Sequence, residues 1–250
     1  MKHMKNIHFQ ILSRAQQRIW EELGDTPTNF VLYGGTAISL RLGHRTSAGF
    51  IFLSNQDFEP KYLYITVPYL KGSSILEMSS NRLTCSVERC GLVSVSFFGG
   101  LSLGRVEEPN LIQENNVCVA SLLDLGASKV RDVIINPSWA DYADVDALLQ
   151  SGVPLIDMLS AAWSLFDVPY SPLFSLKVMA YFEGVGADLS QDMRNRIIEA
   201  IEDVDLDTLR LLTVYPQLAP ERGMGGCGGN FGCKRDRRRC TASGVVPSPW

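Results

Sequence analysis

Apolar side chains near the start of the chain recur at helical spacing and predict an amphipathic helix over residues 8–23. The repeating positions include Phe9, Leu12, Ala15, Ile19 and Leu23. Because positions three and four apart share one side of a helix, this side is expected to face a core. The segment 24–27, which contains a glycine and a proline, is expected to end the helix.

Short apolar runs separated by glycine-containing turns follow and indicate strands. Residues 29–33 predict a first strand, after which Gly34 and Gly35 lead into a helix over 36–42 that stops at Gly43. Further strands are predicted at residues 50–53, 75–78, 83–88 and 92–98.

From Ser121, which is expected to be an N-cap, the pattern becomes helical. Helices are predicted over residues 122–135, 139–150, 154–166, 172–182, 191–202 and 206–213. The predicted fold class is therefore α+β. A small mixed sheet with helices occupies residues 1–118, and a helical half over residues 119–220 packs on it.

Residues 221–250 break this pattern, because glycines precede an arginine cluster and few large apolar residues are present. Such a composition predicts a disordered tail. A basic tail that touches RNA and an out-of-frame translation product are the alternative interpretations.

The formal charge of −4 hides an uneven distribution of charge. Six of the 23 basic residues and one of the 27 acidic residues lie in 222–250, which leaves 17 basic and 26 acidic residues in the rest. An acidic body does not indicate general nucleic-acid binding.

The hydropathy and cysteine patterns predict a cytoplasmic protein without a membrane partner. No apolar run approaches the ~20 residues that cross a bilayer, and no apolar signal core follows the first residues. Cys85, Cys90 and Cys118 lie in apolar or strand-like contexts and are expected to be buried thiols. The spacing of Cys227, Cys233 and Cys240 does not match common zinc sites.

The most informative stretch joins residues 33–37 (Tyr-Gly-Gly-Thr-Ala) to residues 40–47 (Leu-Arg-Leu-Gly-His-Arg-Thr-Ser). A strand that ends in two glycines at a helix N-terminus lets backbone N–H groups approach a phosphate. By itself such a turn more often reflects tight packing.

Together with later segments, this stretch resembles the AbiEii/AbiGii nucleotidyltransferase toxin family. Residues 119–129, 141–149 and 172–182 resemble later blocks of the family, in the same order. The resemblance implies a polymerase-β-like nucleotidyltransferase fold and transfer of a nucleotide from an NTP to an acceptor with Mg²⁺. It also implies tRNA or another RNA as acceptor, and an antitoxin protein as partner in a toxin–antitoxin or abortive-infection system.

The sequence departs from the family at the metal motif, where Gly49-Phe50-Ile51 replaces Asp-x-Asp. Alternate residues of a strand face the same side, so two aspartates there would converge on one metal ion. The strand at 92–98 offers only Ser94 and Ser96 in place of a third carboxylate. Mg²⁺ binding is therefore doubtful, and no metal ligand is assigned. Asp57 and Glu59, which follow the strand, are the nearby acids considered as substitutes for the missing carboxylates.

The resemblance implies that Lys129 holds NTP phosphates and that Asp141 and Asp144 orient this lysine or assist the acceptor. It also places Gly34, Gly35, Arg45 and Ser47 at the phosphates. The structural alternatives are a solvated lysine, acids that complement the helix dipole, and a surface arginine.

Four other residues receive structural interpretations. His44 is expected to cap the preceding helix, and Asp124 to be an early-helix acid. Asp146 is expected at the surface. Gly126 is unfavourable inside a helix, so it is expected to reflect either close packing or sequence drift.

The predicted function is that of a nucleotidyltransferase toxin homologue whose catalysis is impaired. The alternatives are a non-catalytic protein that binds nucleotide, RNA or antitoxin, and a decayed gene product.

Overall fold

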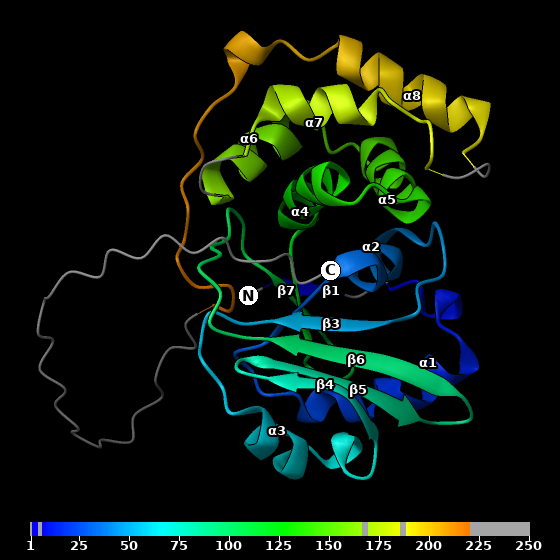
Figure 1. Cartoon of the computed structure of the whole chain (residues 1–250), viewed down its shortest axis with the longest axis vertical. Helices are drawn as coiled ribbons and strands as arrows, with labels where there is room; N and C mark the ends of the chain where they lie inside the picture. The colour runs from blue at the N-terminus through cyan, green and yellow to red at the C-terminus, as the bar shows by residue number, and fades with distance from the viewer. Residues whose placement is uncertain (1, 5–6, 167–169, 186–188, 221–250) are drawn as a thin grey trace, which may run out of the picture.

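The computed structural model describes residues 2–4, 7–166, 170–185 and 189–220. The tail predicted at 221–250 lies outside the described residues. The fold is mixed α+β, as predicted, and combines one sheet with a helical layer (Figure 1). None of the helices in the described ranges is long and apolar enough to cross a membrane.

The described strands form one mixed sheet in the order β1-β7-β8-β2-β3-β6-β5-β4. Their bounds are β1 Lys2–Met4, β2 Val31–Tyr33, β3 Gly49–Leu53, β4 Ser74–Ser79, β5 Arg82–Glu88, β6 Leu92–Phe98, β7 Asn110–Ile112 and β8 Cys118–Val119. β3 runs antiparallel to β2 and parallel to β6, so it lies directly beside β2, the strand that leads into the Gly34-Gly35 turn.

The two faces of β3 differ because side chains alternate along a strand. Phe50 and Phe52 are fully buried, and their rings contact Trp20 and Phe97. Gly49 and Ile51 face the other way and stay partly exposed. α1 (Arg14–Trp20) and α3 (Pro60–Thr66) therefore cover the aromatic side of the sheet.

The opposite face supports α2 (Gly34–Leu42) and, beyond it, the helical layer seen in Figure 1. The helices of this layer are α4 Leu122–Ile135, α5 Trp139–Gln150, α6 Leu155–Leu165, α7 Pro172–Met179 and α8 Gln191–Glu202. α5 packs against both α4 and α2, so it connects the helical layer to the Gly34-Gly35 turn.

Several predicted elements differ in extent. The helix predicted over 8–23 is divided into the short 3₁₀ turns Phe9–Ile11 and Glu22–Asp25 and the helix α1, because Ser13 starts α1 with a capping box. The 3₁₀ turn Pro68–Leu70, α3 and the short strands β1, β7 and β8 were not predicted.

The helix predicted over 206–213 is wrong, because only Leu206–Thr208 forms a 3₁₀ turn. Residues 209–219, here called the C-terminal arm, run from the helical layer back to the sheet (Figure 1). The Leu212 N–H donates to Ser164 Oγ at 2.8 Å, and Arg105 and Tyr215 pair through two backbone hydrogen bonds. Contacts with distant segments thus replace helical hydrogen bonds.

The cysteine predictions hold for two of the three described thiols. Cys85 and Cys118 are buried, but Cys90 is exposed. Cys90 occupies a left-handed position (φ 57°) in the turn between β5 and β6, which turns its side chain away from the core.

Candidate functional site

The N-terminus of α2 begins at Gly34, whose φ of +76° favours glycine. No side chain caps the first turn of α2, and the N-cap residue is Tyr33. The first N–H groups of a helix have no partner within the helix and carry its positive partial charge. This turn is therefore suited to an anion.

Arg45 and Ser47 lie directly over Gly35. A Cβ atom at Gly35 would stand 2.2 Å from Arg45 Nη2 and 3.3 Å from Ser47 Oγ, so a larger residue would displace the Arg45 guanidinium. Gln16 Nε2 donates to the Ser47 carbonyl at 2.7 Å and fixes this part of the loop. The structure thus brings together four of the predicted phosphate-site residues, Gly34, Gly35, Arg45 and Ser47.

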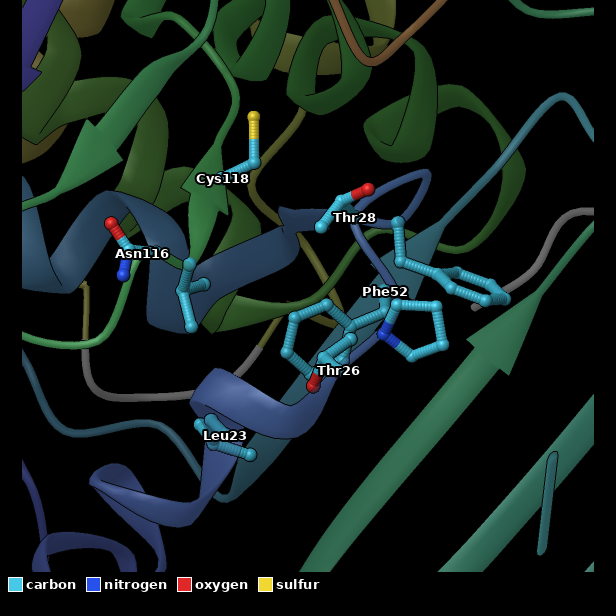
Figure 2. Close-up of a pocket in the computed structure, with 9 residues that line it drawn as sticks. Leu23, Thr26, Thr28, Phe52, Asn116 and Cys118 are labelled. Carbon is cyan, nitrogen blue, oxygen red and sulfur yellow. The ribbon is translucent and has the colours of Figure 1, made fainter. Parts of the chain in front are cut away.

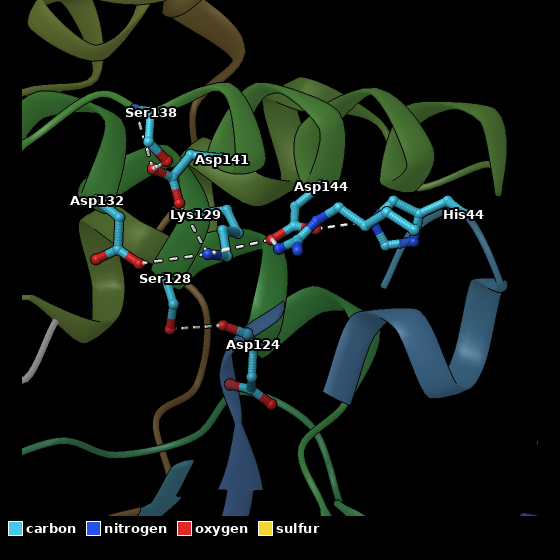
Figure 3. A network of polar contacts seen from close by, with 9 residues as sticks. His44, Asp124, Ser128, Lys129, Asp132, Ser138, Asp141 and Asp144 are labelled. Atoms are coloured by element: carbon cyan, nitrogen blue, oxygen red, sulfur yellow. Dashed lines mark hydrogen bonds and ion pairs between the residues drawn. The ribbon is translucent and has the colours of Figure 1, made fainter. Parts of the chain in front are cut away.

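Asp144, on α5, is the centre of a buried ion network (Figure 3). Its side chain is 0% exposed and accepts from His44 Nε2 and Arg45 Nε, each at 2.7 Å. Arg45 Nη2 completes a bidentate pair at 2.7 Å. Burial alone raises the pKa of Asp144, but hydrogen bonds from His44 and Arg45 and the charge of Lys129 hold it well below its usual range.

Lys129, on α4, is enclosed by carboxylates from three positions. Its Nζ lies 2.9 Å from Asp141 Oδ1, 3.2 Å from Asp144 Oδ2 and 4.0 Å from Asp132 Oδ2. Burial lowers the pKa of Lys129, but the charges of Asp144, Asp141 and Asp132 outweigh it and leave the pKa raised. The solvated-lysine interpretation is therefore wrong.

Asp141 combines the two roles considered for it. Its carboxylate accepts from Ser138 Oγ at 2.6 Å and from the Ser138 N–H at 3.2 Å, which forms a capping box at the start of α5. The other oxygen of the same carboxylate accepts from Lys129. The helix cap thereby fixes the position of a site residue.

His44 does not cap α2, contrary to expectation. The chain leaves α2 through the left-handed Gly43, and the His44 side chain turns toward Asp144. The available signal was the position of this histidine directly before Arg45 in the family-like string.

Asp146 is buried and not at the surface, because Arg196 of α8 pairs with it at 2.7 and 2.8 Å. Asp124 is an early-helix acid of α4, and it is fully buried. It accepts from Ser121 Oγ at 2.6 Å and from the Val106 N–H at 2.7 Å. Burial raises the pKa of Asp124 to about 6.

Gly126 marks close packing between helices. A Cβ atom there would lie 2.8 Å from Met158 Cγ on α6.

The sheet side of the site carries no carboxylate at the motif positions. Gly49 pairs with Ser94, and Ile51 pairs with Ser96. Ile51 Cδ1 would lie 3.3 Å from a Cβ at Gly34, so this residue lies beside the turn as predicted. A Cβ at Gly49 would stand 2.4 Å from the Ser94 carbonyl oxygen, which leaves no space for any side chain.

The present residues do not fit Mg²⁺, which requires oxygen ligands. Asp57 pairs with Asn81 Nδ2 at 2.6 Å and Glu59 caps α3, so neither compensates at Gly49. Among the described residues, no group of three His, Cys, Asp or Glu side chains is arranged to hold a metal ion.

A small hollow lies on the other side of β3, where Phe52 faces Leu23, Thr26 and Asn116 (Figure 2). Its lining contains no acidic or basic side chain. Its volume of about 10 Å³ matches roughly one water molecule, so it offers no alternative site for a nucleotide.

No protein-family model and no curated protein matches the sequence. Among solved structures, the fold is similar to MenT4, a nucleotidyltransferase toxin from Mycobacterium tuberculosis H37Rv, with a TM-score of 0.53 and 14% identity. That match covers 77% of this chain and 83% of MenT4. An antigenic nucleotidyltransferase-like protein from Paracoccidioides brasiliensis matches with a TM-score of 0.36 and 14% identity, over 69% of this chain and 79% of that one. The likeness to MenT4 establishes a nucleotidyltransferase-like fold.

Proposed function

We propose that this chain is a nucleotidyltransferase toxin homologue that binds nucleotide phosphates at the start of α2 without catalysing metal-dependent transfer. The fold likeness to MenT4 and the family-like motifs support the homology. The observation that carries the loss of transfer is the pair Gly49 and Ile51, because Ile51 lies beside Gly34 without a carboxylate and Gly49 has no space for any side chain.

The α2 turn supports phosphate binding. It combines an uncapped helix N-terminus, the Arg45 guanidinium and the Ser47 hydroxyl within a few ångströms of Gly35. Such a combination of backbone N–H groups and a guanidinium recognises phosphate oxygens.

The sheet side limits what the bound phosphate can undergo. Phosphoryl and nucleotidyl transfer depend on positioning and on neutralisation of the developing charge. Metal ions supply this neutralisation and stabilise the transition state by several kcal/mol. Each ~1.4 kcal/mol corresponds to a factor of ten in rate. Gly49, Ile51, Ser94 and Ser96 provide no carboxylate ligand for such an ion.

Lys129 does not replace the metal. Its ammonium group already contacts Asp141 and Asp144, with Asp132 at 4.0 Å, so its charge is balanced by the protein. The phosphate-holding role that the resemblance implies for Lys129 stays a prediction, as do an RNA acceptor and an antitoxin partner.

A transfer assay on the purified full-length chain tests the proposal. With Mg²⁺, each labelled NTP in turn and total tRNA, no label should be incorporated. Incorporation that disappears on Lys129→Ala would overturn the proposed loss of transfer.

A binding assay tests the phosphate site separately. ATP should bind weakly by titration calorimetry, with little difference between EDTA and Mg²⁺, and Arg45→Gln should weaken it. Arg89→Gln is the matched control, because Arg89 follows β5 and pairs with Glu22, and neither residue belongs to α2 or to the loop after it. Absence of ATP binding by the parent protein would contradict the proposed site.

A further inference from the structure

Asp144 reaches the anion site from a different layer of the molecule. It belongs to α5, whereas His44 and Arg45 lie in the loop between α2 and β3. Figure 3 shows His44 and Asp144 side by side, and Arg45 donates two hydrogen bonds to the same Asp144 carboxylate. Within the described ranges, no other carboxylate pairs with Arg45. The orientation of Arg45 therefore depends on a residue of the helical layer.

The contacts of Arg45 fix its guanidinium plane. Nε and Nη2 donate to the two oxygens of Asp144, and Nη1 donates to the Thr46 carbonyl at 2.9 Å. The same Nη2 atom lies over Gly35. Because a bidentate pair sets both the direction and the plane of a guanidinium, Asp144 determines which Arg45 hydrogens remain for a ligand at Gly35.

We propose that Asp144 is a positioning residue for the anion site on α2, because it holds the Arg45 guanidinium over Gly35 from α5. This inference rests on the proposed phosphate binding and goes further. The loop between α2 and β3 supplies Arg45 to the site, and the helical layer supplies the residue that positions it. Asp141 and Asp132 serve as internal comparisons: they surround Lys129, but Arg45 donates to neither of them.

Positioning and simple electrostatics predict opposite effects of neutralising Asp144. A carboxylate near an anion site repels the anion, so its removal should strengthen binding if charge alone mattered. If Asp144 holds Arg45 in place, its removal should weaken binding in spite of the lost repulsion. Asp132→Asn removes a carboxylate from the same network without releasing Arg45 or the cap of α5, and so it shows the electrostatic effect by itself.

The experiment measures binding of free ATP in EDTA to the full-length protein and its variants. Asp144→Asn should weaken ATP binding about tenfold, which corresponds to ~1.4 kcal/mol. Asp132→Asn should bind ATP as tightly as the parent or more tightly. Arg45→Lys keeps the charge but loses the planar fork, so it should also weaken binding, and it should have little further effect in the Asp144→Asn background.

Equal or tighter ATP binding by Asp144→Asn would overturn the positioning role, and so would full additivity of the two substitutions. If the parent protein binds no ATP, the proposed function fails together with the inference. If it binds ATP through Arg45 but Asp144→Asn has no effect, only the inference fails.

Hydrogen exchange of the parent protein gives a result that does not depend on the Asp144 variant being folded. ATP should slow amide exchange in α5 around residue 144 as well as in residues 34–47. Protection confined to residues 34–47, with α5 unchanged, would overturn the proposed coupling.

Discussion

The helical side of the candidate site and its sheet side meet at Gly34, and they differ in how their polar groups are satisfied. On the helical side, Asp144 and Lys129 are buried and paired with neighbouring charges. On the sheet side, Gly49 and Ile51 carry no charge, and Ile51 lies beside Gly34. The charges of the helical side are balanced within the protein, and the motif positions of the sheet side offer no carboxylate to a metal ion.

The difference follows from what each set of charges needs. Opposite charges that pair with each other are stable without a ligand, and removal of one partner leaves a buried charge uncompensated. Two carboxylates on neighbouring positions of one strand face would repel each other whenever the metal is absent. A glycine and an isoleucine avoid this repulsion, whereas loss of Asp144 would leave buried positive charges unpaired.

The largest expected effect is on the helical side. Asp144→Asn should lower the free energy of unfolding by about 3–5 kcal/mol, because Arg45 and Lys129 lose a buried counter-charge. Denaturant unfolding measures this loss. Asp157→Asn breaks the exposed pair with Arg210 and should cost at most about 1 kcal/mol. Similar losses in the two variants would show that the buried Asp144 network stabilises the fold no more than an exposed ion pair does.

A smaller effect is expected on the sheet side. Gly49→Ala should destabilise the protein by about 1–3 kcal/mol, because its Cβ meets the rigid Ser94 carbonyl. Gly126→Ala is the control, since the flexible Met158 side chain can move and alanine favours the helix. If Gly49→Ala were neutral in thermal or denaturant unfolding, β3 and β6 would not be packed as closely as described.

Carboxylates can be returned to the sheet side without changing Gly49. Ile51 and Ser96 are paired neighbours and both are partly exposed, so Ile51→Asp with Ser96→Asp places two acids side by side. Mg²⁺ should then tighten ATP binding by about tenfold, or ~1.4 kcal/mol, in titration calorimetry. The pair Ile51→Asn and Ser96→Asn should show no Mg²⁺ dependence, and an equal response of both designs would exclude a metal effect.

The pH dependence should be the smallest effect, because two buried aspartates act in opposite directions. Burial raises the pKa of Asp124 from 3.8 to about 6, so its contribution to stability falls as pH rises through this range. The lowered pKa of Asp144 contributes stability above 3.8 that is lost as pH falls below it. The thermal midpoint should therefore rise slightly from pH 7 to 5 and fall below pH 4. Asp124→Asn should abolish the rise, and its persistence in that variant would assign it to another group.

Strong local patterns predicted the elements that form the site. The predicted bounds of α4 and α5 coincide with the observed ones, because a capping serine precedes each helix and a proline separates them. β6 also matches its predicted bounds, since Val93, Val95 and Phe97 alternate along it. Ile51 lies beside Gly34, a placement that the family resemblance implied, whereas the strand period predicted only that Gly49 and Ile51 share one face.

The missed features depend on partners distant in sequence. β8 is only two residues long and exists through its pairing with β2 and β7. Asp146, on α5, is buried because it pairs with Arg196 of α8, fifty residues later in the chain. The role of His44 likewise depends on Asp144, one hundred residues away. Local composition contains no information on such pairs.

The C-terminal arm has a consequence for the order in which the chain acquires its structure. Its contacts join Tyr215 to Arg105 and Leu218 to Asn55, across 110 and 163 positions. Closing such large loops costs conformational entropy before any contact repays it, and long-range contacts slow folding. During synthesis at the ribosome, the sheet and the helices up to α8 emerge before the C-terminal arm. Closure of the arm is therefore a late event, and until it occurs the nascent chain leaves the groups around Arg105 open to solvent and to chaperones.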